Sequence, residues 1–273
     1  MSLYISSLNS GSNGNCYYIG NETEAILIDA GISCSEVEKR MQRLGLNIRN
    51  LKAIFISHEH TDHISGVQVL CKKYQLPVYI TGPTMQAGRL SLDKHLVRSF
   101  SANNSISLGK LSITPFPKFH DAADPFSFMV GCNDINVGVF TDIGVACKNV
   151  SDHFHHCHAA FLECNYDDTM LDRGSYPWFL KNRIRGDRGH LSNKEALHLF
   201  VTHKAVFMSH LVLSHLSKNN NCPELVKQLF NNNAYGVQMI VASRYEETPL
   251  YHICGTPLPL QHIMNSSQLS FAF

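Results

Sequence analysis

The sequence has almost no net charge, no long apolar run and no closely spaced pair of cysteines. Its 273 residues include 23 Lys and Arg against 22 Asp and Glu, which gives a formal net charge of +1. A charge so near zero provides no global attraction for nucleic acid, so any such binding must rest on a local patch. No apolar run approaches the ~20 residues that span a membrane, so we expect no membrane partner.

The nine cysteines are dispersed along the chain, and none belongs to a Cys-x-x-Cys pair. An odd, scattered set indicates free thiols and a reducing compartment, so we expect a cytoplasmic protein. Residues 1–5 indicate a first strand and not a signal peptide, because no basic segment is followed by an apolar block. Length and apolar content fit one α/β domain over residues 1–273, with a loose tail from about residue 256. The oligomeric state stays open.

The richest chemistry lies in residues 57–63, Ser-His-Glu-His-Thr-Asp-His. They follow residues 51–56, an apolar run that predicts a buried strand. Neutral imidazoles are preferred ligands of zinc and related ions, and an aspartate can join them. His58 and His60 can point to the same side of the strand end, while the last two residues begin a turn and can close around a second ion. The segment therefore predicts a two-metal site rather than a polar loop, and paired metals suit hydrolysis of an ester or phosphodiester.

Two later residues also stand directly after an apolar strand pattern. His120 follows the run 111–116 closely, and Asp142 follows the run 135–140 within a Thr-Asp-Ile-Gly turn. Taken alone, each is more typical of a cap or a surface turn. A dinuclear site needs a third imidazole on one metal and a carboxylate between the metals, and these two residues can supply them.

His215 follows the strand pattern 211–214 in the same way. His210, just before that strand, is the competing candidate ligand. The strand-end position favours His215, because the earlier candidates occupy the same kind of position.

A second histidine-rich segment, residues 153–158, carries four imidazoles. Val150, Phe154 and Cys157 have helical spacing, which places most of these histidines on an exposed helix face. We therefore interpret this segment as structural rather than as another metal site.

The most basic stretch, residues 173–188, carries five cations opposed within it only by Asp187. It also holds the single tryptophan, Trp178, next to Phe179, and we expect it to form a loop. Cations interleaved with aromatics suit a phosphate backbone and stacked bases. An exposed, charged helix face would have the same composition, so both interpretations stay open.

Hydrophobic patterning predicts alternating strands and helices around these residues. Strands are expected at 3–8, 16–19, 25–29, 51–56, 77–80, 111–116, 126–130, 135–140, 159–162, 211–214, 237–242 and 250–253. Helices are expected from the capping box Ser33–Glu36 to about residue 44, over 65–74, from the capping box Ser192–Glu195 to about 204–208, and over 223–231. Ligands at the carboxyl ends of such strands are typical of α/β folds.

An ordered series of short motifs spans residues 10–221. It consists of Gly-Ser-Asn-Gly-Asn, His-x-His-x-Asp-His, the lone His120, Thr-Asp-Ile-Gly, Glu-Cys-Asn-Tyr-Asp, Asp-Arg-Gly-His-Leu-Ser-Asn and Ser-His-Leu-Ser-Lys-Asn-Asn. The series resembles the YycJ/WalJ (VicX) family of the metallo-β-lactamase superfamily, which is related to ribonuclease Z and the phosphonate-pathway phosphodiesterases. The late motifs are the more specific ones, since true lactamases and glyoxalases lack them.

This resemblance implies an α/β fold, the metallo-β-lactamase αβ/βα four-layer sandwich, and a 5′-to-3′ exonuclease activity on DNA. It also implies two divalent metal ions, zinc or manganese, with iron as a further option. The implied ligands are His58, His60 and His120 for metal 1, Asp62, His63 and His215 for metal 2, and Asp142 as the bridge. The implied catalytic residues are Asp62, Glu163 and His190, the last two resembling a pair in which a glutamate orients a proton-donating histidine.

The mechanism that we expect uses a metal-bridging hydroxide to attack phosphorus in line with the departing 3′ oxygen. The candidates for holding the substrate are Asn165, Arg185, Lys218 and Asn219. We expect a nucleic-acid substrate, DNA in preference to RNA. The alternatives are an RNA nuclease, a hydrolase of a small ester, thioester or cyclic phosphodiester, and a non-catalytic protein with a vestigial site.

Overall fold

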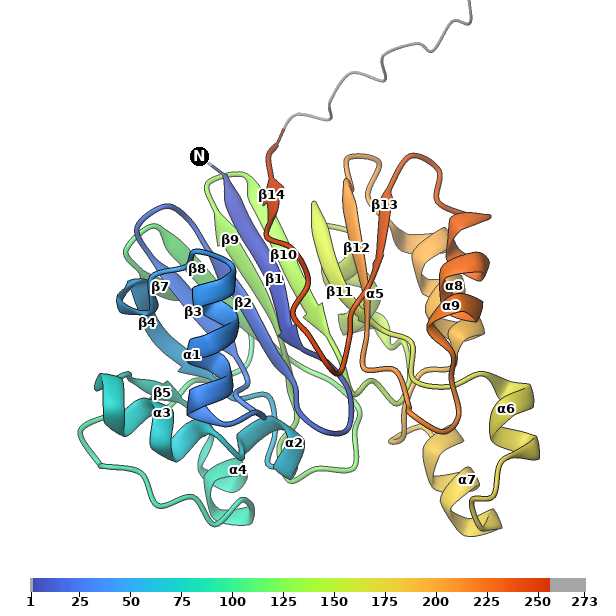
Figure 1. The fold of residues 1–273 in the computed structure, drawn as a ribbon, viewed down its shortest axis with the longest axis horizontal. Helices are drawn as coiled ribbons and strands as arrows, with labels where there is room; N and C mark the ends of the chain where they lie inside the picture. The colour runs from blue at the N-terminus through green and yellow to red at the C-terminus, as the bar shows by residue number, and fades with distance from the viewer. Residues whose placement is uncertain (1, 256–273) are drawn as a thin grey trace, which may run out of the picture.

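The structure of residues 2–255 is a computed structural model in which two β-sheets pack face to face (Figure 1). Within these residues the first sheet has seven strands in the order β14-β1-β2-β3-β4-β5-β6. Its strands are β1 (Leu3–Asn9), β2 (Cys16–Gly20), β3 (Ala25–Ile28), β4 (Leu51–Phe55), β5 (Val78–Tyr79), β6 (Val97–Arg98) and β14 (Tyr251–Ile253). Strands β3, β4, β5 and β6 run parallel to one another.

The second sheet, over the same described residues, also has seven strands, in the order β13-β12-β11-β10-β9-β8-β7. These are β7 (Ile106–Leu108), β8 (Leu111–Pro117), β9 (Phe126–Cys132), β10 (Ile135–Phe140), β11 (Ala159–Glu163), β12 (His210–Ser214) and β13 (Gln238–Val241). The strands β10 to β13 are parallel, whereas β7 to β10 form an antiparallel meander.

Helices cover the outer face of each sheet, so the chain forms four layers, α/β/β/α (Figure 1). On the first sheet lie α1 (Cys34–Arg43) and α3 (Val67–Tyr74), and on the second lie α5 (Lys148–Phe154), α8 (Asn193–His203) and α9 (Pro223–Asn231). Shorter helical segments are the 3₁₀ turn η1 (Ile48–Asn50), α2 (Thr61–Ile64), α4 (Gly82–Ala87), α6 (Asp168–Arg173) and α7 (Trp178–Arg185). This arrangement confirms the expected four-layer sandwich.

The central core lies between the two sheets and consists of the inward faces of both. Tyr17 and Phe55 from the first sheet lie against Phe161 and Phe128 from the second, with ring centroids 4.8 and 5.6 Å apart. Two further apolar clusters fill the spaces between each sheet and its own helices. The buried β-branched and aromatic runs of the sequence therefore become strands covered on both faces.

The predicted strands and capped helices are present, with ends shifted by a residue or two. Ser33 caps α1, Gly45 follows that helix with φ +69°, and Ser192 and Glu195 form a complete capping box on α8. The expectation of a loop over residues 173–188 was wrong, because α7 occupies its centre. The short elements α4, α6, β6 and β7 were not predicted, and the expected tail from about residue 256 lies outside the described residues.

The carboxyl ends of the central parallel strands of both sheets meet at one edge of the sandwich, the lower edge in Figure 1. The short helices α2, α6 and α7 lie at this edge, which also carries the site described below. Within residues 2–255 the structure contains no helix with the length and apolar character needed to cross a membrane.

Candidate metal centre

The segment after β4 places its donors by a change of backbone conformation. His58 and His60 are still extended, and His60 is the N-cap of the single-turn helix α2, which begins at Thr61. The backbone of α2 is fixed from the first sheet, since Asn15 N donates to the Asp62 carbonyl at 2.7 Å. Gly31 is required beside it, because a Cβ atom there would come within 1.6 Å of the same carbonyl oxygen.

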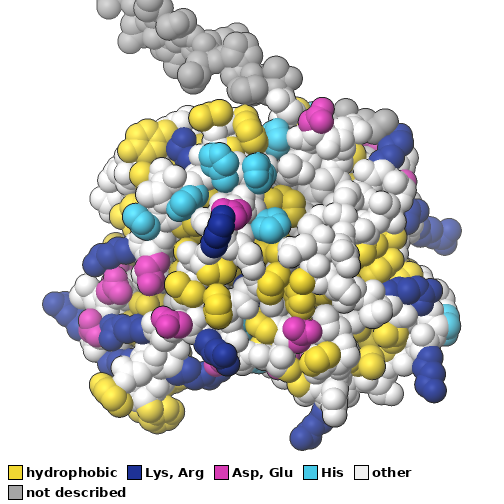
Figure 2. Space-filling model, turned by 180° about the vertical axis from the view of Figure 1, so that it is seen from behind, with side chains coloured by type: hydrophobic (Ala, Val, Ile, Leu, Met, Phe, Trp, Pro, Cys, Tyr) yellow, Lys and Arg dark blue, Asp and Glu magenta, His cyan; other side chains and the backbone are white. Residues whose placement is uncertain are grey.

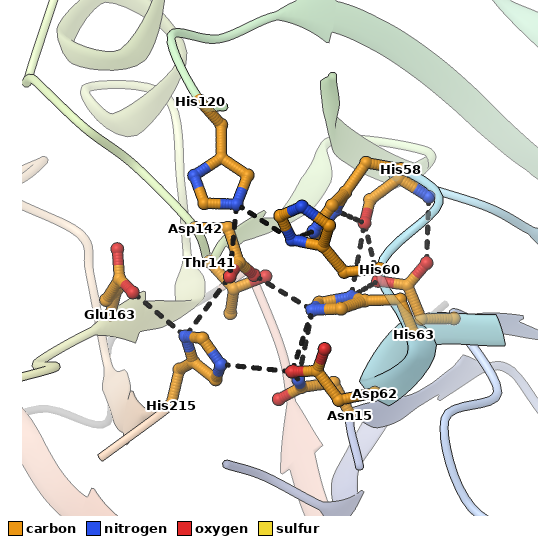
Figure 3. A network of polar contacts seen from close by, with 12 residues as sticks. Asn15, His58, His60, Asp62, His63, His120, Thr141, Asp142, Glu163 and His215 are labelled. Carbon is orange, nitrogen blue, oxygen red and sulfur yellow. Dashed lines mark hydrogen bonds and ion pairs between the residues drawn. The ribbon is translucent and has the colours of Figure 1, made fainter. Parts of the chain in front are cut away.

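The other donors come from the second sheet, each from just beyond a strand. His120 follows β8, Asp142 follows β10 and His215 follows β12, while Glu163 ends β11. Asp142 and His215 have φ of 55° and 56°, the left-handed region that non-glycine residues seldom occupy. This backbone conformation turns both side chains into the space between the sheets (Figure 3). Strain of this kind at strand ends is often associated with function.

Three imidazoles form one cluster of donor atoms. The Nδ1 atom of His60 lies 3.1 Å from Nε2 of His58 and 3.3 Å from Nε2 of His120. These three nitrogens converge on one point (Figure 3), and the three residues form a group whose donor atoms lie within 4.8 Å of one another. Such a group of imidazoles can hold a metal ion.

A second cluster lies beside the first. The Oδ2 atom of Asp62 is 3.5 Å from Nε2 of His63 and 3.5 Å from Nε2 of His215. Asp142 lies between the clusters, with Oδ2 3.2 Å from His63 Nε2 and Oδ1 3.7 Å from His120 Nε2. We call the seven residues the metal centre: His58, His60, Asp62, His63, His120, Asp142 and His215. The structure therefore brings together all seven residues that the sequence singled out as ligands.

The ring orientations are fixed by hydrogen bonds on the outer side of the metal centre. Nδ1 of His63 is 2.7 Å from the Asp29 carboxylate, Nδ1 of His58 is 2.9 Å from Ser57 Oγ, and Nδ1 of His120 is 3.0 Å from the Gly189 carbonyl oxygen. With Nδ1 engaged, each of these rings directs Nε2 inward. Such outer partners fix the tautomer of metal-binding histidines and raise their basicity.

Glu163 joins three segments of the chain that surround the end of β11. Its Oε1 atom lies 2.9 Å from His215 Nδ1 and 2.7 Å from His190 Nδ1. Its Oε2 atom accepts hydrogen bonds from the backbone N–H groups of Ile143, at 2.7 Å, and Leu191, at 3.3 Å. Glu163 is fully buried, whereas the His190 side chain is 22% exposed. His190 is therefore held from inside while its Nε2 remains available to a bound molecule.

Electrostatics divide the histidines of the metal centre into two kinds. Burial lowers the pKa of His58 well below its ordinary value and that of His120 to about 4, so both rings are neutral and can offer a lone pair. Burial also disfavours the charged form of His215, but the nearby carboxylates of Asp142, Asp62 and Glu163 outweigh it and raise the pKa of His215 to about 10. The pKa of His63 is raised for a similar reason.

The carboxylates of the site stay ionised despite burial. Burial favours the neutral form of Asp142, but His215 and His63 outweigh it and hold its pKa well below the ordinary value. Burial also favours the neutral form of Glu163, but the charge of His190 and its hydrogen bond outweigh this effect and lower the pKa of Glu163 to about 2. Asp29, Asp142 and Glu163 are buried carboxylates of this region, and the buried lysine beside them is Lys118.

The residues fit divalent metal ions on three observations. Three imidazole nitrogens face one another at close range, which calls for a cation between them. Asp142 Oδ2 and His215 Nε2 are buried without a hydrogen bond. The nitrogen and carboxylate donor set suits Zn²⁺, Mn²⁺ and Fe²⁺. The residues are thus able to bind metal, and the choice of ion is not fixed by them.

The candidates for substrate binding are less uniform. The Asn165 amide is buried and donates to the His215 carbonyl oxygen at 3.0 Å, so it positions the ligand loop. The Asn219 amide donates to the Tyr176 hydroxyl at 3.0 Å, and Arg185 forms an ion pair with Asp172. Lys218 is exposed and has no such partner among residues 2–255. Of the four, Lys218 alone presents an uncompensated charge.

The helix α7 projects beside the metal centre with Trp178 78% and Phe179 71% exposed. Figure 2 shows hydrophobic side chains flanked by Lys and Arg side chains at the corner of the molecule that α7 occupies. Two acids outside the stretch also oppose its cations, because Arg183 pairs with Asp121 at 2.5 Å and Arg185 with Asp172. Both interpretations of the stretch therefore apply in part: it is an exposed helix, and its net positive charge is small.

His210 lies outside the metal centre, as its position at the opposite end of β12 requires. Its ring is 2.8 Å from Ser209 Oγ and 5.6 Å from the Tyr251 ring. Three supporting residues were missed in the sequence. Asp29, Asn15 and Lys118 are buried polar residues that contact the ligands or their backbone. The available signal was positional, since Asp29 ends a strand pattern in the same way as the ligands.

Comparison with known proteins gives consistent matches. Residues 10–159 match the metallo-beta-lactamase superfamily. The chain is 34% identical over 246 residues to "Exodeoxyribonuclease YycJ" of Bacillus anthracis, which covers 87% of this chain and 92% of that protein. It is 33% identical over 233 residues to "Exodeoxyribonuclease WalJ" of Streptococcus pneumoniae serotype 2 (strain D39), covering 82% of this chain and 86% of that protein.

A solved structure shares the fold at lower sequence identity. The metallo-beta-lactamase fold protein YhfI from Bacillus subtilis superposes with a TM-score of 0.72 at 15% identity, covering 92% of this chain and all of that one. At this identity the likeness concerns the fold alone. It agrees with the four layers of the sandwich.

Proposed function

The chain belongs to the metallo-beta-lactamase superfamily and, within it, to the family of the YycJ and WalJ proteins, and on this premise we propose that it is a metal-dependent exodeoxyribonuclease. The observation that supports the chemistry best is the convergence of seven donors from both sheets around two adjacent points. Single-metal binding sites that serve structure alone are closed by four ligands, whereas this set extends over two centres with a shared carboxylate.

In this proposal two divalent ions bind, with zinc or manganese preferred and iron possible. His58, His60 and His120 would hold the first ion, and Asp62, His63 and His215 would hold the second. Asp142 would be shared by both groups, because one of its oxygens faces His63 and the other faces His120. When bound, the ions supply Lewis acidity toward phosphoryl oxygens and lower the pKa of water to near neutrality.

The protein residues then orient the substrate and move a proton. His190 donates a proton to the departing 3′ oxygen, and Glu163 stabilises the charged imidazole and fixes its orientation through Nδ1. Lys118 contributes positive charge next to Asp142, because its ammonium donates to the carbonyl oxygen of the preceding residue, Thr141, at 2.6 Å. The Asp62 side chain is 19% exposed. It can therefore face a bound substrate as a catalytic residue and also serve as a ligand.

The substrate in this proposal is nucleic acid, with DNA in preference to RNA and digestion from the 5′ end. The names of the YycJ and WalJ relatives support DNA. Arg185, at the end of α7, and Lys218 and Asn219, on the loop after β12, are offered as phosphate contacts, whereas Asn165 acts through the backbone of His215. A near-neutral chain needs such local contacts.

The test uses 5′-phosphorylated single- and double-stranded DNA with manganese or zinc, and it measures released mononucleotides. The wild-type protein is compared with Asp62→Ala and with Glu163→Gln, which keeps the size of the side chain but removes its charge. We expect stepwise release by the wild type, loss in Asp62→Ala, and a lowered kcat with a changed pH profile in Glu163→Gln.

Three results would contradict parts of the proposal. Cleavage of RNA but not DNA would keep the chemistry and replace the substrate. Efficient turnover of S-lactoylglutathione or nitrocefin would favour a small-molecule hydrolase. A chain that holds less than one metal after dialysis into zinc or manganese would remove the metal-dependent mechanism altogether.

A further inference from the structure

A pocket of about 290 Å³ lies beside the metal centre. Three segments form its walls: Ser10 after β1, residues 216–218 together with 221 and 223 after β12, and residues 241–245 at the end of β13. The lining combines apolar and polar side chains, and it includes two cations, Lys218 and Arg244. Tyr245 also lines it, with 73% of its side chain exposed.

The pocket shares a wall with the metal centre. Ser10 Oγ accepts a hydrogen bond from the backbone N–H of His215 at 2.7 Å, and Ser10 also lines the pocket. Leu216 directly follows the ligand His215, and Lys218 is three residues beyond it. Because an extended chain advances at most about 3.6 Å per residue, the Lys218 Cα lies within roughly 11 Å of the His215 Cα.

The charge of the pocket is of one sign. None of the described residues that line it is Asp or Glu. The Lys218 ammonium has no hydrogen bond or ion pair to residues 2–255, and the Arg244 guanidinium donates to the Leu216 carbonyl oxygen at 2.6 Å without a carboxylate partner there. This differs from α7, where neighbouring carboxylates neutralise Arg183 and Arg185. An anion therefore finds two positive charges here, neither of which is neutralised by a carboxylate of residues 2–255.

The backbone around the cations is held in place from the first sheet. The Asn13 amide donates to the Arg244 carbonyl oxygen at 2.9 Å, and the Arg40 guanidinium donates to the Tyr245 carbonyl oxygen at 3.1 Å. The Ser10 N–H donates to the Ser243 carbonyl oxygen at 3.1 Å. A site whose backbone is already fixed loses little entropy on binding a ligand.

We propose that this pocket, the terminal-phosphate pocket, binds the 5′-phosphate of the strand that the metal centre cleaves. Lys218 and Arg244 contact the phosphate, and the exposed Tyr245 ring stacks on the terminal base. The inference rests on the proposed nuclease function and adds to it the group that defines the end of the substrate. Arg is well suited to a phosphate because its guanidinium donates two parallel hydrogen bonds.

The products of hydrolysis agree with this placement. Water adds to the phosphorus of the second nucleotide, the bond from that phosphorus to the 3′ oxygen of the first breaks, and the 3′ oxygen takes a proton. The first nucleotide leaves with its own 5′-phosphate, and the shortened strand begins with a new 5′-phosphate. Every cycle therefore regenerates the group that the pocket binds.

The proton donor lies on the correct side of the metal centre for this geometry. The rings of His190 and His215 have centroids 5.3 Å apart, and the loop that follows His215 walls the pocket. The departing nucleotide would thus lie between His190 and the terminal-phosphate pocket.

The test measures binding and cleavage separately. Metal-loaded Asp62→Ala protein is titrated with a fluorescent oligonucleotide that carries either a 5′-phosphate or a 5′-hydroxyl, and binding is followed by anisotropy. We expect roughly tenfold tighter binding of the phosphorylated strand, which is the effect of one charge-assisted contact. Adding Lys218→Ala should reduce that preference to about threefold or less. Lys227→Ala, which removes the same charge from an exposed position on α9, should retain it.

Each result bears on the pocket or on the nuclease function. An equal affinity for both strands, or a preference that survives both Lys218→Ala and Arg244→Gln, overturns the pocket. An equal weakening of both strands by Lys218→Ala also overturns it, since that behaviour indicates an internal phosphate. Wild-type cleavage of both strands without preference removes the pocket and keeps the function. A Lys218-dependent preference in binding, without cleavage of any DNA, keeps the pocket and removes the function.

Discussion

Residues 58–63 and residues 153–158 are both rich in histidine, yet the structure uses them differently. His58 and His63 are buried at the end of a parallel strand and face donors from the other sheet. The histidines of the second segment lie along α5 and the turn after it, where His155 and His156 are exposed. Figure 2 shows histidine side chains gathered on the back of the molecule, where α5 lies against the second sheet.

The partners of the second segment are ordinary structural ones. The His153 ring stacks on Phe116 with centroids 3.9 Å apart, and the His158 Nδ1 atom accepts a hydrogen bond from the Asn136 backbone at 3.2 Å. Among residues 2–255, each group of donors able to hold an ion draws on the metal centre or its Glu163–His190 neighbours. The comparison teaches that convergence from several strands, rather than the local density of histidine, makes a candidate metal site.

The sharpest way to break this comparison is to remove one residue from each segment. We expect Asp62→Ala to lower the rate of bis(p-nitrophenyl) phosphate hydrolysis by roughly 10²–10³-fold or more, because a ligand and a charge are lost together. His155→Ala should stay within about twofold of the wild type, since that side chain is exposed. Comparable losses in both variants would contradict the distinction.

Removal of metal should destabilise the protein strongly. Binding to the folded state alone stabilises by about 4 kcal/mol when free metal is 1,000 times the dissociation constant. For a chain of this size that corresponds to a fall in Tm of roughly 8–16 °C after chelation. The double variant His155→Ala/His156→Ala should lose the same amount as the wild type in calorimetry, and a smaller loss would mean that the second segment also binds metal.

A third substitution tests the support of the ligands instead of the ligands. Asp29 accepts from His63 on the outer side and also from Ser57 N–H at 2.8 Å. We expect Asp29→Asn to weaken metal binding about 10–100-fold, measured by competition with a chromophoric chelator. Asp152→Asn, at a carboxylate beside the second segment, is the matched control and should leave the affinity unchanged.

The smallest effect concerns pH in the metal-free protein. The folded-state pKa of His215 is about 10 against an ordinary value of 6.5, so its proton contributes stability that is complete below pH 6.5 and is lost as the pH rises through 10. Between about pH 6 and about pH 8 the unfolding free energy should fall by roughly 1–2 kcal/mol. Urea unfolding of chelated protein measures this, and a rise in stability would show that the ring is neutral when folded.

The sequence predicts well which residues the fold brings together, because strand ends leave a clear pattern. His120, Asp142 and His215 each follow a buried apolar run, and the parallel pairing of β10, β11 and β12 brings Asp142 and His215 to the same edge of the sheet. Asp29 has the same position but no motif of its own. Its role depends on the pairing of β3 with β4, which sets Ser57 and His63 beside it and is invisible along a single strand.

The helix α7 was missed for a physical reason. None of its residues is buried, so no apolar periodicity marks it in the sequence. The ion pairs of Arg183 and Arg185 with Asp121 and Asp172 depend on the folded arrangement of α6 and α7, so composition alone overstated the positive charge. The two-residue strand β6 is likewise too short to leave a period.

The metal centre draws its donors from positions that range from His58 to His215, and this spread has a consequence during synthesis. A chain that has left the ribosome only as far as β11 already carries all six residues of the metal centre that precede His215, yet it lacks β12, His215 and the bond from His215 to Glu163. The donor set is therefore complete only after most of the chain has been translated.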